Sequence, residues 1–191
     1  MALFNWTDLI KDSTESKLST NTNYGFDIVH VQGAGDISLV ATKGLSDYLQ
    51  AAEGQYQDYQ RVELYFSLPS YIRAEEALWP NEWLSRIAQI PKKNDTWFGP
   101  GDTIPAGNPP KAIAPNLPAD HFILAEPFDL AEQLVHDEVK FLAVIPIFPP
   151  ELEYKMRNSG TALIMRLRKK GFSERIDTYR TSVCRKRFLG F

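Results

Sequence analysis

The segment from Val139 to Ile147 constrains the fold most, because nearly all of its side chains are apolar. A strand of this composition cannot leave either face in water, so both of its faces must be covered by other elements. It therefore predicts an interior strand of a sheet with packed layers on both sides.

Four further segments have the composition and alternation of strands, namely 25–31, 36–42, 61–68 and 121–125. The third is the clearest, since apolar side chains recur at every second position from Val62 to Phe66. Gly33 to Asp36 is predicted to be the turn of a hairpin between the first two. Residues 13–23, rich in Ser, Thr and Asn, are predicted to form a loop.

Helical patterns occupy 3–12, 79–90, 149–158 and 161–170, with Gly160 interrupting the last two. Pro80 suits the first turn of the second helix, and Pro91 is expected to end it. Leu163, Ile164 and Leu167 are expected to form the buried face of the last helix. Strands come first and helices are inserted or trail, which predicts a single α+β domain, an α/β sandwich with a mixed, largely antiparallel sheet covered by helices.

The stretch after Pro91 has the composition of a shaped loop. It contains Trp97 and Phe98, then Gly99 and Gly101 around a proline, then Asp102 and Thr103. Glycines permit backbone angles closed to other residues, and the proline stiffens the turn. Residues 105–119 hold five prolines and are predicted to be an irregular surface segment.

Composition is typical of a globular protein of 191 residues with a net charge of -3. The longest apolar run, 141–148, is too short to span a membrane, and the N-terminus lacks the pattern of a signal peptide. The single cysteine, Cys184, excludes an internal disulfide framework. These features predict a cytoplasmic protein with no membrane association.

Charge is distributed unevenly along the chain. Residues 155–191 carry eleven basic and two acidic side chains, whereas the preceding residues are strongly acidic. The simplest interpretation is a basic helix and tail lying on an acidic body. In that arrangement Val183 and Cys184 are buried, Arg185 to Arg187 stay in water, and basic groups reach acids such as Glu151 and Glu153.

No motif specifies a metal, cofactor or nucleotide site. His30, His121 and His136 lack metal-ligand spacing and are interpreted as hydrogen-bonded structural residues. Cys184 lies among basic residues, which favours a thiolate, but a lone cysteine is usually a small apolar residue. The glycine turns at 33–36 and 99–102 lack the sequence of a phosphate loop. No cofactor and no catalytic residue is predicted.

Two other classes of function stay open. A hydrolase could use groove carboxylates, for which Glu75, Glu76, Asp120, Glu126 and Glu151 are available, although the sequence gives no distances between them. A nucleic-acid adaptor could use the basic C-terminal segment, with stacking groups at Tyr179, Phe188 and Phe191. The acidic remainder of the chain makes nucleic acid an unfavourable partner.

The order of several motifs resembles the suppressor of fused (SUFU) domain family. The motifs begin with FDIVH at 26–30, VATKGLS at 40–46 and RVELYFSLP at 61–69. WPNEWL at 79–84 and WFGPGDTI at 97–104 follow. The series ends with the apolar strand through Pro149, ELEYK at 151–155 and RTSVC at 180–184. The resemblance covers about residues 25–187 and divides the chain into an N-terminal helix and loop (1–24), a SUFU-like domain (25–187) and a tail (188–191).

The resemblance implies an α/β sandwich without known enzymatic activity. The animal namesake binds an extended peptide between two domains, and this chain is similar to the N-terminal domain alone. Compact single-domain members are typical of bacteria, and many of them are thought to be immunity proteins that neutralise toxin domains. We therefore expect a non-enzymatic protein-binding module whose partner is a toxin domain or an extended peptide. The candidate binding residues are Trp97, Phe98, Gly99, Gly101, Asp102 and Thr103, while the oligomeric state is left open.

Overall fold

A computed structural model describes residues 3–74 and 76–184. Its strands form one sheet of seven in the order β1-β2-β3-β4-β7-β6-β5. They are β1 (Thr14–Asn21), β2 (Phe26–Gln32), β3 (Ser38–Lys43), β4 (Val62–Ser67), β5 (Thr103–Pro105), β6 (His121–Ala125) and β7 (Lys140–Ile147). Adjacent strands are antiparallel except for the parallel pair β4 and β7. The sheet is thus mixed and largely antiparallel, which confirms the predicted fold class.

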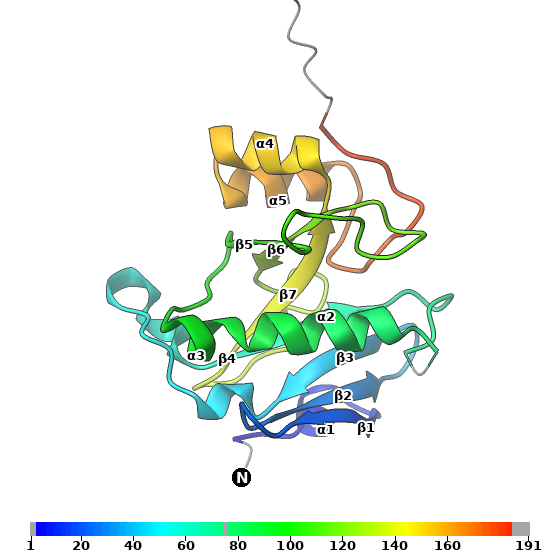
Figure 1. The fold of residues 1–191 in the computed structure, drawn as a ribbon. Helices are drawn as coiled ribbons and strands as arrows, with labels where there is room; N and C mark the ends of the chain where they lie inside the picture. The colour runs from blue at the N-terminus through cyan, green and yellow to red at the C-terminus, as the bar shows by residue number, and fades with distance from the viewer. Residues whose placement is uncertain (1–2, 75, 185–191) are drawn as a thin grey trace, which may run out of the picture.

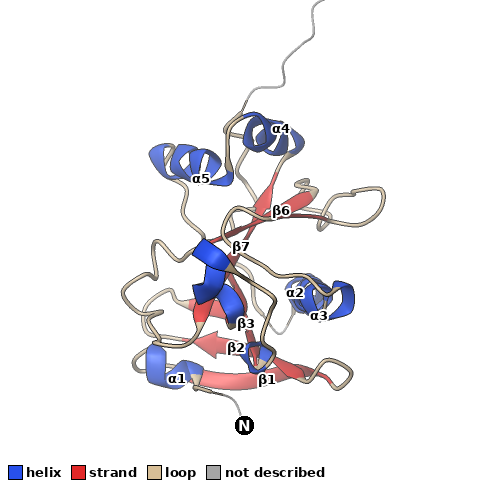
Figure 2. Ribbon diagram, turned by 90° about the vertical axis from the view of Figure 1, so that its left-hand side faces the viewer, coloured by secondary structure: helices blue, strands red, loops and turns tan. Residues whose placement is uncertain are grey.

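Helices cover both faces of this sheet (Figures 1 and 2). One face carries α2 (Leu78–Ala88) and α3 (Ile90–Asn94), and the other carries α1 (Trp6–Leu9) and α5 (Gly160–Lys169). A fifth helix, α4 (Pro149–Arg157), packs beside α5 after β7, and two 3-10 helices, η1 (Leu45–Asp47) and η2 (Gly54–Gln60), lie between β3 and β4. Each face has its own apolar core, so the chain is a single two-sided α+β domain.

The apolar strand lies where its composition requires. β7 pairs with β4 on one side and β6 on the other, and its residues from Phe141 to Ile147 are all buried. Its side chains alternate between the two cores, with Leu142 on the α2 side and Phe141 on the α5 side. The alternating strand 61–68 is likewise confirmed as β4, since Val62, Leu64 and Phe66 all join the core under α2.

The predicted loop at 13–23 is wrong, because residues 14–21 form the edge strand β1. An edge strand pairs on one side only, so its side chains need not be apolar, and hydroxyl and charged residues dominate here. Local ion pairs help to hold it, including Lys17 Nζ to Asp27 Oδ2 at 2.6 Å. A register shift between Lys17 and Ser19 marks a bulge, a common feature of exposed edges.

Two helix boundaries also differ from the prediction. Pro91 does not end the helical region, because α2 stops at Ala88 and Pro91 lies in the first turn of α3. A proline is tolerated there, since its missing N–H would have no partner within the helix. The N-terminal helix is only Trp6–Leu9, shorter than the predicted 3–12.

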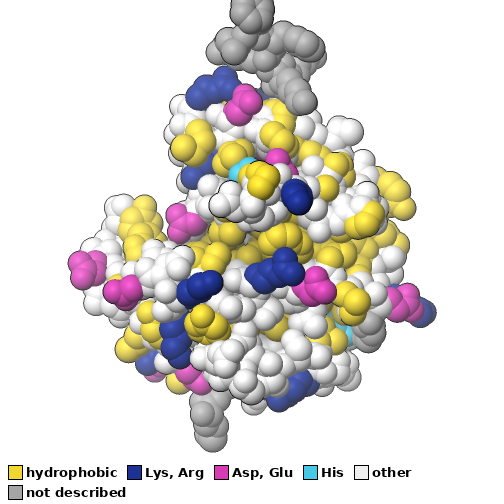
Figure 3. Space-filling model, viewed as in Figure 1, with side chains coloured by type: hydrophobic (Ala, Val, Ile, Leu, Met, Phe, Trp, Pro, Cys, Tyr) yellow, Lys and Arg dark blue, Asp and Glu magenta, His cyan; other side chains and the backbone are white. Residues whose placement is uncertain are grey.

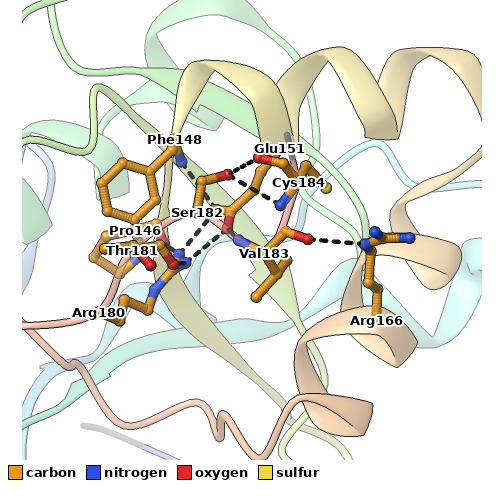
Figure 4. Close-up of polar contacts among 9 residues, drawn as sticks. All are labelled: Pro146, Phe148, Glu151, Arg166, Arg180, Thr181, Ser182, Val183 and Cys184. Atoms are coloured by element: carbon orange, nitrogen blue, oxygen red, sulfur yellow. Dashed lines mark hydrogen bonds and ion pairs between the residues drawn. The ribbon is translucent and has the colours of Figure 1, made fainter. Parts of the chain in front are cut away.

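The C-terminal segment is anchored to α4 by a buried ion pair (Figure 4). Arg180 donates to both carboxylate oxygens of Glu151, at 2.7 and 2.9 Å, and the two side chains are 6% and 0% exposed. Val183 N–H donates to Glu151 at 2.9 Å, and Arg166 of α5 donates to the Val183 carbonyl at 3.1 Å. Cys184 is buried. The predicted docking of this segment is confirmed up to Cys184, while Arg185 to Arg187 lie outside the described residues.

Candidate functional site

The glycine-proline stretch folds into a tight turn from Gly99 to Asp102. The Asp102 N–H donates to the Gly99 carbonyl at 3.2 Å, and the Gly99 N–H donates to the Asp102 carboxylate at 2.9 Å. Pro100 precedes Gly101, whose φ of 93° lies in the region that favours glycine. A proline followed by a glycine of positive φ is the sequence of a type II turn. The single acid of the loop therefore closes the turn with one oxygen.

The turn continues directly into the sheet. The Gly101 N–H donates to the Leu124 carbonyl at 2.7 Å, and the Leu124 N–H donates to the Asp102 carbonyl at 2.9 Å. β5 then pairs with β6 from Thr103 onward. Among the described residues, β5 has no strand on its outer side, so the turn sits at a free edge of the sheet.

The start of α5 supports the same turn from the side. A Cβ atom built on Gly160 would lie 2.5 Å from the Gly101 Cα atom, closer than real side chains approach. The two backbones can therefore touch only because residue 160 is glycine, whereas Gly101 is required by its positive φ. This contact fixes the turn against the helix as well as against the sheet.

The two aromatic residues before the turn play different parts. Phe98 is 4% exposed and belongs to the core under α2, so its side chain supports the loop from beneath. Trp97 is partly buried, covers Gly99 and packs on Tyr56 with ring centroids 4.8 Å apart. Of the pair, only Trp97 offers part of its ring to the surface. Asp102 and Thr103 are each half-buried.

One open hollow of about 220 Å³ lies beside the turn, and a second of about 240 Å³ adjoins it at Glu126 and Pro127. The first lies between Pro100 and Gly101 on one side and α5 on the other, and the second lies between Tyr59 and residues 131–141. Glu126 and Pro127 line both, so Glu126 stands at their junction. The Tyr59 hydroxyl donates to its carboxylate. The sequence counted Glu126 among possible groove acids but gave no sign that it lies next to the glycine-proline turn.

The other acids considered for a hydrolase do not converge. Glu151 is held by Arg180, Asp120 contacts His121 at 2.8 Å, and Glu76 pairs with Arg73 at 2.9 Å. Glu75 lies outside the described residues. Glu76, Asp120 and Glu151 are thus each engaged in a separate local contact.

Two buried glutamates that the sequence analysis did not consider stabilise neighbouring loops. Glu63 accepts bonds from the hydroxyls of Thr42 and Ser46 and from the N–H groups of Gly44 and Ser46. Burial raises the pKa of Glu63, and these hydrogen bonds oppose the rise. Glu174 accepts the N–H groups of three consecutive residues from Phe128 to Leu130 and the Tyr65 hydroxyl. Every carboxylate oxygen has a donor, which indicates a structural role.

His30 and the cysteine also have structural surroundings. His30 Nε2 lies 3.0 Å from the Ser38 hydroxyl across β2 and β3, but both side chains are buried and no hollow described above reaches them. Burial raises the pKa of the Cys184 thiol, although nearby Arg166 opposes it, so the thiol is not activated. Within residues 3–74 and 76–184, no three His, Cys, Asp or Glu residues gather as a metal site would require.

The basic side chains of the C-terminal part are largely engaged within the protein. Arg180 binds Glu151, Arg157 binds Glu153 at 2.7 Å, and Arg175 donates to the Asp36 carbonyl at 2.7 Å. Arg166 and Arg168 lie over the rings of Tyr154 and Phe128, at 4.9 and 5.3 Å from their centroids. These contacts confirm that the basic segment lies on the body of the protein.

The sheet order, the two-sided cover of helices and the rigid turn at a sheet edge define the chain as an α+β protein of one domain. The family model for suppressor of fused protein (SUFU) matches residues 22–181. The chain therefore belongs to the suppressor of fused family, as its motifs had suggested. None of the curated proteins matches it significantly.

Three solved structures share this fold at low sequence identity. A SUFU homologue from Neisseria gonorrhoeae has a TM-score of 0.70 and 17% identity, covering 92% of this chain and 90% of its own. The Sufu–Fu complex contains a chain with a TM-score of 0.57 and 17% identity, at 93% and 80% coverage. Drosophila Suppressor of Fused has a TM-score of 0.52 and 18% identity, and the match covers 90% of this chain but 42% of the Drosophila chain.

The helices of the described ranges are all too short or too polar to cross a bilayer.

Proposed function

We propose that this chain is a non-enzymatic protein-binding module whose partner docks on the Gly99–Asp102 turn and the outer edge of β5. The observation that carries the proposal is the bracing of this turn by a strand, a helix and its own carboxylate. A rigid surface loses little conformational entropy when it binds, which favours affinity. An extended segment of the partner could add to the free edge of β5 through its unpaired backbone groups, where Pro105 offers a carbonyl but no N–H.

The negative charge of this face favours a partner with basic groups. Asp102 and Glu126 both lie at the turn or at the hollow beside it, and each uses one carboxylate oxygen in a bond within the protein. Within the described residues no hydrogen bond uses the second oxygens, which can therefore accept from a basic group on the partner. Trp97 supplies a partly exposed aromatic surface next to them, a residue type enriched at binding hot spots.

A toxin domain is the partner that we favour, which would make the chain an immunity protein. The family membership supports binding to proteins in general, since one structure of the same fold is that of a Sufu–Fu complex. A toxin encoded beside this chain's gene is the natural first candidate.

The test is capture of the neighbouring gene's product by this protein and by two variants. Asp102→Asn keeps an oxygen for the Gly99 N–H but removes the charge, while Asp95→Asn makes the same change at an exposed position outside the turn. We expect Asp102→Asn to weaken the complex about tenfold and Asp95→Asn to leave it unchanged. Failure to recover any stable complex, or equal binding by both variants, would count against the proposal.

A further inference from the structure

Residues 50–60 contact the candidate site without belonging to its turn or its edge strand. Gln50 in this segment is 4% exposed, and its side-chain amide faces the backbone of Phe98. Its oxygen accepts from the Phe98 N–H at 2.9 Å, and its nitrogen lies 3.4 Å from the Phe98 carbonyl. The same nitrogen donates to the Tyr59 carbonyl at 2.7 Å. Gln50 therefore joins η2 to the residue that leads into the turn.

Two tyrosines of η2 make further contacts with the site. The ring of Tyr56 packs against Trp97 at 4.8 Å, and the Tyr59 hydroxyl donates to Glu126. Burial, together with the Glu126 contact, raises the pKa of Tyr59, so its phenol stays protonated and remains a donor at neutral pH. The segment thus touches the entry of the turn at two points and the neighbouring carboxylate at a third.

We infer that residues 50–60 set the relative position of the turn and Glu126, and that Gln50 is the principal positioning residue of the binding face. The effect of Gln50 on partner affinity rests on the proposed function, because it concerns the same binding face. Gln50 is buried, so it does not reach a partner and acts only through Phe98 and Tyr59. A buried amide whose donor and acceptor are both used is costly to remove, because its partners then lack hydrogen bonds.

The chain offers a matched control within the same segment. Gln60 also donates its side-chain amide to a backbone carbonyl, that of Ala52 at 3.1 Å, but it contacts neither the turn nor Glu126. Gln50→Leu and Gln60→Leu therefore remove the same chemical group from two places, of which only the first supports the site.

The measurement is fluorine NMR of protein labelled with 5-fluorotryptophan, with signals assigned by Trp→Phe variants. The sequence contains four tryptophans, at positions 6, 79, 83 and 97. In Gln50→Leu we expect the Trp97 signal to shift or broaden while the other three stay in place. In Gln60→Leu we expect all four to stay in place. Hydrogen exchange at the Phe98 N–H should become about tenfold faster in Gln50→Leu only.

An unchanged Trp97 signal in Gln50→Leu would overturn the inference, as would an equal shift of all four signals, which indicates general loosening. If Gln50→Leu does not fold, Tyr56→Leu takes its place, with faster exchange at the Phe98 and Gly101 N–H groups as the expected result and unchanged exchange as the contrary one.

Binding then separates this inference from the proposed function. Against the partner captured as above, Gln50→Leu should lose about tenfold in affinity and Gln60→Leu none. If Asp102→Asn weakens the complex and Gln50→Leu does not, the positioning inference fails and the proposed function stands. If neither variant affects binding but Trp97 responds to Gln50→Leu, the proposed function fails and Gln50 is a support of the turn alone.

Discussion

Gly101 and Gly160, 59 positions apart in the chain, meet backbone to backbone where the glycine-proline turn touches the first residue of α5. The contact leaves no room for a side chain on Gly160, and Gly101 also needs its positive φ of 93°. The contact connects the turn, whose Phe98 packs into the core under α2, to α5, which covers the other face of the sheet. The rigidity of the turn therefore depends on packing between distant parts of the chain.

Replacing Gly160 by alanine should destabilise the protein by about 1–3 kcal/mol, the usual cost of forcing an extra methyl group into a packed site. Gly160 is the first residue of α5, and helix propensity alone would favour alanine over glycine there, so a loss of stability would have to come from the close contact. Urea unfolding measures the difference in stability. Thr161→Ala, at an exposed neighbouring position, should change it by no more than about 0.5 kcal/mol. Equal effects of the two substitutions would contradict the close contact.

The Glu151–Arg180 pair should be essential for docking of the C-terminal segment. Arg180→Met leaves a carboxylate that is 0% exposed without its cation, for which a loss of about 3–5 kcal/mol is expected. Arg157→Met removes an arginine from a half-exposed pair with Glu153 and should cost about 1 kcal/mol at most. Chemical unfolding of both variants tests the contrast, and similar losses would show that burial does not distinguish the pairs.

Truncation tests the same segment independently. Deleting 176–191 removes Ile176, which is 3% exposed and donates its N–H to the Ser67 carbonyl at 2.8 Å, together with Arg180. We expect this deletion to lower the thermal midpoint strongly, and deletion of 188–191 to leave it nearly unchanged. An unchanged midpoint in the longer deletion would mean that the segment contributes nothing to stability and would favour a partner-binding role for it.

The buried carboxyl of Glu63 predicts a dependence on pH. Its pKa is raised in the folded protein, so it contributes most to stability below the unfolded value near 4.5 and less as the pH rises through the folded value. Glu63→Gln does not titrate. The thermal midpoint of the variant minus that of the wild type should therefore become more positive between pH 4.5 and pH 7. A difference in thermal midpoint that stays constant over this pH range would refute the raised pKa of Glu63.

Periodicity and composition predicted most of the fold, but not its polar parts. β7 and β4 were found because buried strands must be apolar or alternate, and α5 because its buried face repeats at helical spacing. β1 was missed because an exposed edge strand can be polar on both faces. Pro91 was misread because the same residue ends one helix and suits the first turn of another.

The candidate site shows the limit more clearly. The turn itself follows from Gly99, Pro100 and Gly101, whose backbone preferences are local. Its supports are not local: Gln50 is 48 positions from Phe98, and Tyr59 is 67 positions from Glu126. Nothing in the sequence alone marks a buried glutamine as the partner of a particular backbone group. Such contacts become visible only when the sheet brings β4, β5 and β6 into one layer.

The most direct test of the account is a hydrogen-exchange footprint of the protein in complex with its captured partner. The account predicts slowed exchange in the complex at residues 97–105, on the turn and β5, and at 124–128 beside it. The outer edge strand β1, with its bulge and its charged side chains, should exchange as in the free protein. Protection confined to β1 or to the C-terminal segment, with residues 97–105 unchanged, would contradict it.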